Sequence, residues 1–138
     1  MHANEENRSD TPSACERDLA LLQGTWIQVG IEENGIVNPP DTYSGPDVTT
    51  LIDGHRFEVR TADGSLLLHG RFTLDATTTP KSITWVDAIG EEAGQPILAS
   101  YRLDDDRFVF IAADPGMARP TQFRTTQGLT MRSFVRRA

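Results

Sequence analysis

Apolar and polar residues alternate with a period of two through most of this chain, from about residue 25 to residue 136. The runs are rich in Val, Ile, Thr, Phe, Tyr and Trp, which favour strands, and clusters of Gly, Pro or Asp separate them. Turns such as Asp53-Gly54 and Asp63-Gly64 are typical of tight hairpins. The pattern predicts strands near residues 25–32, 48–52, 56–61, 66–75, 82–87, 97–103, 108–112, 121–125 and 129–136.

The connections between these runs leave no room for crossover helices. No helical pattern of ten or more residues lies between them, so we expect consecutive hairpins and not a parallel sheet. Such strands either stack into a sandwich or close into a barrel. We favour the barrel, because closure removes the exposed strand edges along which chains aggregate. The predicted fold is all-β: a single antiparallel up-and-down β-barrel of about eight or nine strands.

The N-terminal region differs from the rest of the chain. Residues 1–14 are polar and hold almost nothing apolar to bury, so we expect a flexible arm. The string ERDLALL at residues 16–22 favours a short helical lead. The chain has 138 residues, which suits one domain, and we assign residues 15–138 to the barrel. Residues 34–47 and 114–120 are long and irregular, so we expect them at the rim or as lids.

Charge, cysteine content and hydropathy restrict the partners and the compartment. The formal net charge of −7 disfavours nucleic acid, which binds through clustered Lys and Arg. Cys15 is the only cysteine, so no intramolecular disulfide can form. No apolar run is long enough for an export signal or a membrane-spanning helix. We therefore expect a cytoplasmic protein that does not insert into a membrane.

Several motifs, in a fixed order over most of the chain, resemble those of a known family. They are LQGTW at 22–26, GRFTLD at 70–75, PKSITW at 80–85, GEEAGQ at 90–95, YRLDDD at 101–106 and DPGMARPTQF at 114–123. The family is an uncharacterised group of bacterial lipocalin-like proteins, abundant in planctomycetes. The resemblance implies a small calycin-type barrel. It implies no particular chemistry, because the family has none assigned and function does not follow from fold.

The resemblance also implies a structural contact. Lipocalins open with Gly-x-Trp on the first strand and pack that Trp beneath an Arg from the last strand. Gly24 and Trp26 match the first half of this pattern, and either Arg132 or Arg136 could supply the guanidinium. A cation–π contact of this kind contributes about 0.5–2 kcal/mol. It would close the base of the barrel and would not be catalytic.

The sequence carries no signal for metal, nucleotide or covalent chemistry. His2, His55 and His69 are too scattered to predict a metal site. No Gly-x-Ser-x-Gly string predicts an activated nucleophile, and no glycine-rich loop between a strand and a helix predicts phosphate binding. We therefore predict neither a metal nor a cofactor.

A barrel of about eight strands is just wide enough to hold one small ligand or to fill itself with side chains. The alternation predicts polar groups inside, at Gln28, Asp87 and Tyr101. For a ligand, we assign the apolar wall to Phe57, Phe72, Trp85, Tyr101, Phe108 and Phe110. Arg119 is a further candidate for ligand binding, where it would cap the mouth or clamp a carboxylate; in the alternative it holds loop carbonyls. In the alternative interpretation, the same aromatic residues are a solid core.

Three functions remain compatible with the sequence. The first is a module that binds a small apolar or amphipathic molecule inside the barrel. The second is a cofactor-independent enzyme, such as a cyclase or isomerase of specialised metabolism, with Asp87 as acid or base and Tyr101 as its hydrogen-bond partner. Burial beside Trp85 would raise the pKa of Asp87 toward working pH. The third is a protein-interaction or inhibitory module that uses an apolar patch on the rim, at Ile36, Val37 and Tyr43.

Overall fold

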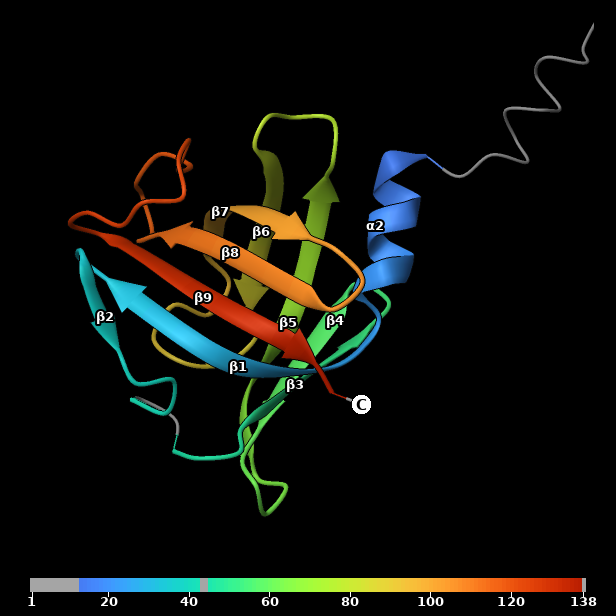
Figure 1. Cartoon of the computed structure of the whole chain (residues 1–138), viewed down its shortest axis with the longest axis vertical. Coiled ribbons are helices and arrows are strands. Elements are labelled where there is room, and N and C mark those ends of the chain that lie inside the picture. Colours follow the sequence, from blue (N-terminus) through green and yellow to red (C-terminus); the bar gives the residue numbers. More distant parts are fainter. Residues whose placement is uncertain (1–12, 43–44, 138) are drawn as a thin grey trace, which may run out of the picture.

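The computed structural model describes residues 13–42 and 45–137 (Figure 1). Within these residues, the helix α2 (Ala14–Leu22) is followed by nine strands. The strands are β1 (Gly24–Glu33), β2 (Ile36–Asn38), β3 (Thr49–Asp53), β4 (Arg56–Arg60), β5 (Leu66–Asp75), β6 (Lys81–Asp87), β7 (Pro96–Leu103), β8 (Arg107–Ala113) and β9 (Leu129–Arg136).

The strands form one closed antiparallel sheet. Their order is β2-β1-β3-β4-β5-β6-β7-β8-β9, and β1 also pairs with β9, from Trp26 opposite Arg136 to Glu33 opposite Thr130. This last pairing closes a barrel of eight strands, with β2 as an extra strand on β1. The all-β barrel that the alternation predicts is confirmed.

The strand predicted at residues 121–125 is wrong. These residues belong to the connection from β8 to β9, and they pair with no strand. The aromatic residue in this segment has a different role, because Phe123 packs under the guanidinium of Arg102, whose Cζ lies 4.0 Å from the ring centre. Both β8 and β9 already have a partner on each side, so no free strand edge is left beside them for this segment.

A short strand occupies part of the stretch predicted to be irregular. β2 pairs with the end of β1, from Ile31 opposite Asn38 to Glu33 opposite Ile36. Asn34 and Gly35 make the turn, with φ angles of 51° and 81°. An Asn-Gly pair between strands is a strong hairpin signal, so the sequence did contain the information for this strand.

Helix α2 begins two residues earlier than predicted. The Oγ of Ser13 accepts a hydrogen bond from the Glu16 N–H at 3.1 Å, and the Glu16 carboxylate accepts one from the Ser13 N–H at 3.0 Å. Ser13 is therefore the N-cap of α2 in a capping box, and Ala14 is the first residue of the helix. The rest of the predicted arm, residues 1–12, lies outside the described residues. Within the described ranges, no helix has the length and apolar character needed to cross a bilayer.

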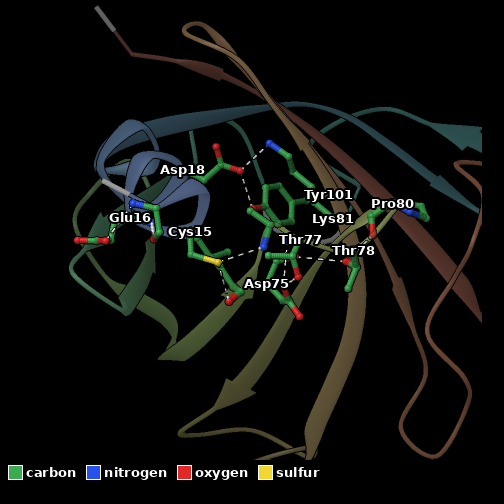
Figure 2. Close-up of polar contacts among 12 residues, drawn as sticks. Cys15, Glu16, Asp18, Asp75, Thr77, Thr78, Pro80, Lys81 and Tyr101 are labelled. Atoms are coloured by element: carbon green, nitrogen blue, oxygen red, sulfur yellow. Dashed lines mark hydrogen bonds and ion pairs between the residues drawn. The ribbon is translucent and has the colours of Figure 1, made fainter. Parts of the chain in front are cut away.

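Polar contacts hold α2 across one end of the barrel (Figure 2). Asp18 accepts hydrogen bonds at Oδ2 from the Tyr101 hydroxyl at 2.7 Å and from the Lys81 ammonium at 2.9 Å. The Cys15 thiol accepts one from the Ala76 N–H at 3.2 Å. These contacts tie the helix to the end of β5, the start of β6 and the end of β7, and this end of the barrel is therefore closed.

Arg136 completes the closed end. Its guanidinium lies over the Trp26 ring, with Cζ 4.3 Å from the ring centre. It also donates hydrogen bonds to the backbone carbonyls of Leu21, Gln23 and Asp105. Gly24 leaves room for it, because a Cβ at that position, where φ is +114°, would lie 3.3 Å from Nη1 of Arg136. Of the two arginines that the resemblance offered, Arg136 makes the contact with Trp26.

Candidate functional site

A cavity of about 490 Å³ lies inside the barrel and reaches Trp26, the ring that Arg136 covers at the closed end. Its lining includes Asp87 at the end of β6 and Asp114 just after β8, and both lie at the barrel end opposite the helix. The lining also contains exposed residues such as Glu92, so the cavity reaches the surface. The cavity therefore runs from Trp26 to an opening at the end opposite α2.

Aromatic side chains form the wall of this cavity. Phe57, Trp85, Phe108 and Phe110 all line it. The ring centre of Trp85 lies 5.1 Å from that of Phe57 and 5.0 Å from that of Phe110. Phe134 also lines the cavity and stacks against Phe108 and Phe110, at 5.6 and 5.8 Å. The contacts join rings from β4, β6, β8 and β9 into one apolar surface.

The wall depends on a glycine in β5. Gly70 is the register partner of Phe57 in β4 and of Asp87 in β6. A Cβ at this position would lie 2.2 Å from the Val86 carbonyl oxygen and 3.0 Å from the Phe57 ring. Any other residue here would push β6 and the Phe57 ring away. Gly70 therefore sets the spacing between two of the lining residues.

Gln28 and Arg132 form a polar pair in the cavity lining. Arg132 donates a hydrogen bond from Nη1 to Oε1 of Gln28 at 2.9 Å, and Nε2 of Gln28 donates to the Pro40 carbonyl at 2.8 Å. Arg132 thus faces the cavity and takes no part in the contact with Trp26. The pair ties β9 to β1 and to the segment that follows β2.

Three carboxylates line the same cavity, at Asp87, Glu92 and Asp114. Glu92 and Asp114 are exposed, whereas Asp87 is half-buried. Burial raises the pKa of Asp87, and the charge of Glu92 raises it further. Within residues 13–42 and 45–137, no side chain or backbone group donates a hydrogen bond to these carboxylates or forms an ion pair with them.

Trp85 carries an unsatisfied hydrogen-bond donor. The residue is 7% exposed, and its indole Nε1 is buried with no partner among the described residues. Buried indole N–H groups normally find an acceptor, and those in a closed, fully packed core nearly always do. In a fully packed core this indole N–H would have an acceptor, so the cavity wall at Trp85 differs from such a core.

Three of the predicted ligand-binding residues, Phe72, Tyr101 and Arg119, lie outside the cavity lining. Phe72 is 1% exposed and belongs to the packed core, where its ring centre is 5.8 Å from that of His55. Arg119 does not cap the mouth. Its guanidinium holds two neighbouring strands together by donating to the Ile83 carbonyl at 2.8 Å, the Ala99 carbonyl at 2.5 Å and the Thr84 hydroxyl at 2.8 Å.

Asp87 and Tyr101 do not meet, so the catalytic pair predicted from the sequence is wrong. Tyr101 is the register partner of Lys81, and Asp87 lies six residues further along β6. Six residues of strand span about 20 Å. Tyr101 lies instead at the closed end, where burial, followed by its hydrogen bond to Asp18, raises its pKa. The alternation predicted that both residues point inward, but it did not predict their positions along the barrel axis.

The cavity includes residues that the sequence analysis missed. Thr130 and Phe134 lie on the inward-facing side of β9, and Ile97 lies near the start of β7. Both strands were predicted, so their alternation contains this information. Glu92 and Asp114 lie in connections, where no periodicity marks a side chain that faces the cavity.

The other candidates lie apart from the cavity. In the described part of the chain, no group of three or more His, Cys, Asp and Glu residues is placed to hold a metal ion. His55 and His69 are not in the cavity lining, and His2 lies outside the described residues. Ile36 and Val37 are 63% and 74% exposed on β2, while Tyr43 also lies outside the described residues.

Compared with models of protein families, with curated proteins and with solved structures, the chain shows no significant match. Its function has to be inferred from the cavity and the residues around it.

Proposed function

We propose that this protein binds a small apolar or amphipathic molecule inside its barrel. The observation that carries the proposal is the cavity of about 490 Å³, which is walled by aromatic rings and reaches the surface at one end. Small-molecule sites are concave, mostly apolar and usually about 300–1,000 Å³ in volume. The order of the sequence motifs further supports membership of the lipocalin-like family that the chain resembles, and such barrels are suited to holding one small ligand.

The distribution of polar groups supports an amphipathic ligand. The rings of Phe57, Trp85 and Phe108 lie in the interior, whereas Asp87 and Asp114 lie at the end away from α2. An apolar body would bury surface against the rings, at about 25 cal/mol per Å². A polar group on the same molecule would remain near the mouth, where water and charged side chains satisfy it.

A neutral fluorescent naphthylamine tests this proposal. Ala112 lines the cavity, so the Ala112→Phe variant places a ring in it. Ala62→Phe is the matched control, because it adds the same ring at an exposed turn between β4 and β5. We expect saturable binding to the wild type and to Ala62→Phe, and at least about tenfold weaker binding to Ala112→Phe. Circular dichroism and the melting temperature establish that each variant is folded. Equal binding to both variants, or no binding to the wild type, contradicts the proposal.

A second candidate function uses the same cavity as a reaction chamber. The observation that favours it is Asp87, a half-buried carboxyl group whose pKa is raised beside an aromatic wall, as in many general acids. Tyr101 has no part in this version. If the protein is an enzyme, the wild-type protein should deplete a compound from a metabolite extract during incubation. The Asp87→Asn variant should leave that compound unchanged. Identical mass spectra for the two proteins would exclude Asp87 as the acid or base.

A further inference from the structure

The cavity lining carries more negatively charged side chains than positively charged ones. Three carboxylates, Asp87, Glu92 and Asp114, stand against one guanidinium, that of Arg132. Arg132 has an acceptor in Gln28 at 2.9 Å, whereas the carboxylates have no donor within the described ranges. A partly buried charge is stabilised by a partner of opposite charge or by hydrogen bonds. The lining therefore favours an occupant that brings positive charge.

The carboxylates come from neighbouring elements at the open end of the barrel, and we call Asp87, Glu92 and Asp114 the acidic arc. Asp87 ends β6, Glu92 lies in the connection to β7, and Asp114 follows β8, the next strand in the sheet. Glu92 is close enough to Asp87 for its charge to affect that carboxyl group. Asp87 is the most buried of the three, so its charge is the least screened by solvent.

Aromatic rings line the cavity next to Asp87. Trp85 precedes Asp87 by two residues on the inner face of β6, and its ring centre lies 5.0 Å from that of Phe110. A cation near the face of an aromatic ring is attracted by the ring quadrupole, most strongly for Trp. A site that combines such rings with a carboxylate can hold an organic cation that has lost part of its hydration.

We propose that the occupant of the cavity is an amphipathic organic cation, with its amine or quaternary ammonium group at the acidic arc and its apolar body against the aromatic wall. The inference rests on the proposed binding function and specifies the chemical class of the ligand. An amphipathic anion is disfavoured, because its charge would lie beside three carboxylates in a chain with a net charge of −7. The single guanidinium in the described lining is already hydrogen-bonded to Gln28.

Three probes with the same ten-carbon chain test the charge preference: decyltrimethylammonium, decanol and decanoate. Each is titrated by calorimetry at a concentration below that at which it forms micelles. We expect the cation to bind most tightly and the anion least tightly, with at least about tenfold between them. The Ala112→Phe variant tests whether the probes bind in the cavity, because it should weaken the binding of the cation and of decanol alike.

Charge-removing variants of the acidic arc test the residues. Asp87→Asn and Glu92→Gln keep the side-chain shape and remove the charge. Asp105→Asn is the matched control, because this carboxylate is exposed in the turn from β7 to β8, at the end closed by α2. We expect Asp87→Asn to weaken the binding of decyltrimethylammonium several-fold and Glu92→Gln to weaken it to a smaller extent. Neither variant should alter decanol binding, and Asp105→Asn should change neither probe.

The outcomes separate this inference from the function on which it rests. If decanol binds and the cation binds no more tightly than decanol, the barrel is a binding protein but the inferred charge class is wrong. If the cation binds more tightly but Asp87→Asn and Glu92→Gln bind it as the wild type does, the acidic arc is not its site. If no probe binds, the proposed function fails together with the inference.

Discussion

Trp26 and Arg136 face one another across the seam that closes the barrel, as register partners of β1 and β9. The Cζ atom of Arg136 lies 4.3 Å from the centre of the Trp26 ring. The same guanidinium donates to three carbonyls in the segments on either side of the seam, at Leu21, Gln23 and Asp105. One side chain therefore joins the first strand, the last strand, the end of α2 and the turn between β7 and β8.

Arg136→Ala should destabilise the fold. The variant removes the cation–π contact and charge-assisted hydrogen bonds to carbonyls, so we expect a loss of about 2–4 kcal/mol in the free energy of unfolding. Arg137→Ala is the control, because this neighbouring side chain is exposed and makes no hydrogen bond to the described residues, whereas its backbone N–H donates to the Thr25 carbonyl. Urea denaturation measures both, and equal stability of the two variants would show that the guanidinium does not stabilise the seam.

Gly70→Ala should be strongly destabilising. Its Cβ would lie 2.2 Å from the Val86 carbonyl oxygen, which belongs to a paired strand and cannot move without disturbing β6. We expect a loss of at least about 2 kcal/mol, the range for an overpacked core. Gly30→Ala is the matched strand variant, because a Cβ there meets only Ser133 at 3.5 Å. Thermal denaturation that ranks Gly30→Ala as the less stable of the two would contradict this assignment.

Tyr101→Phe should weaken the closed end and leave binding in the cavity unchanged. The hydroxyl donates to Asp18 at 2.7 Å in a buried environment, so its removal should lower the free energy of unfolding by about 1–3 kcal/mol. A change in probe affinity without a change in stability would instead place Tyr101 in the binding site.

The same tyrosine should make stability depend on alkaline pH. Burial and then the hydrogen bond to Asp18 raise the pKa of Tyr101 above its ordinary value of 10.0. Above pH 10 the unfolded chain releases this proton and the folded protein keeps it, so stability falls as the pH rises. Denaturation curves from pH 8 to pH 11 should show a smaller decline for Tyr101→Phe. Identical slopes for the variant and the wild type would exclude Tyr101 as the cause.

Asp87 should lower stability at neutral pH. Burial, and secondarily Glu92, raise its pKa in the folded state above the ordinary value of 3.8. The folded protein therefore binds this proton more tightly than the unfolded chain, and stability is lost as the pH rises through the raised pKa. Asp87→Asn should consequently be more stable than the wild type at pH 7 and equally stable at pH 3. Urea titrations at both pH values measure this, and the opposite order at pH 7 would show that the carboxylate is stabilised in the fold.

The sequence by itself determined the eight strands of the barrel and the inward side of most of them. Alternation placed Phe57, Trp85 and Phe108 inside, because side chains of a strand point to opposite faces in turn. Turn residues such as Asp53-Gly54 marked where the strands reverse. These are local properties of neighbouring residues, so a single sequence contains them.

Only the tertiary structure decided which inward residues share the cavity. Tyr101 and Asp87 were both predicted to point inward, yet Tyr101 lies under α2 and Asp87 lies at the opposite end of the barrel. The position along the barrel axis depends on strand register and on where the helix docks. Register likewise placed Arg136, and not Arg132, over Trp26. The connections brought Glu92 to the cavity and Arg119 to the carbonyls of β6 and β7, through contacts between residues far apart in the chain. A period of two specifies a face of the sheet, and the position along the barrel axis arises only when all the strands close on one another.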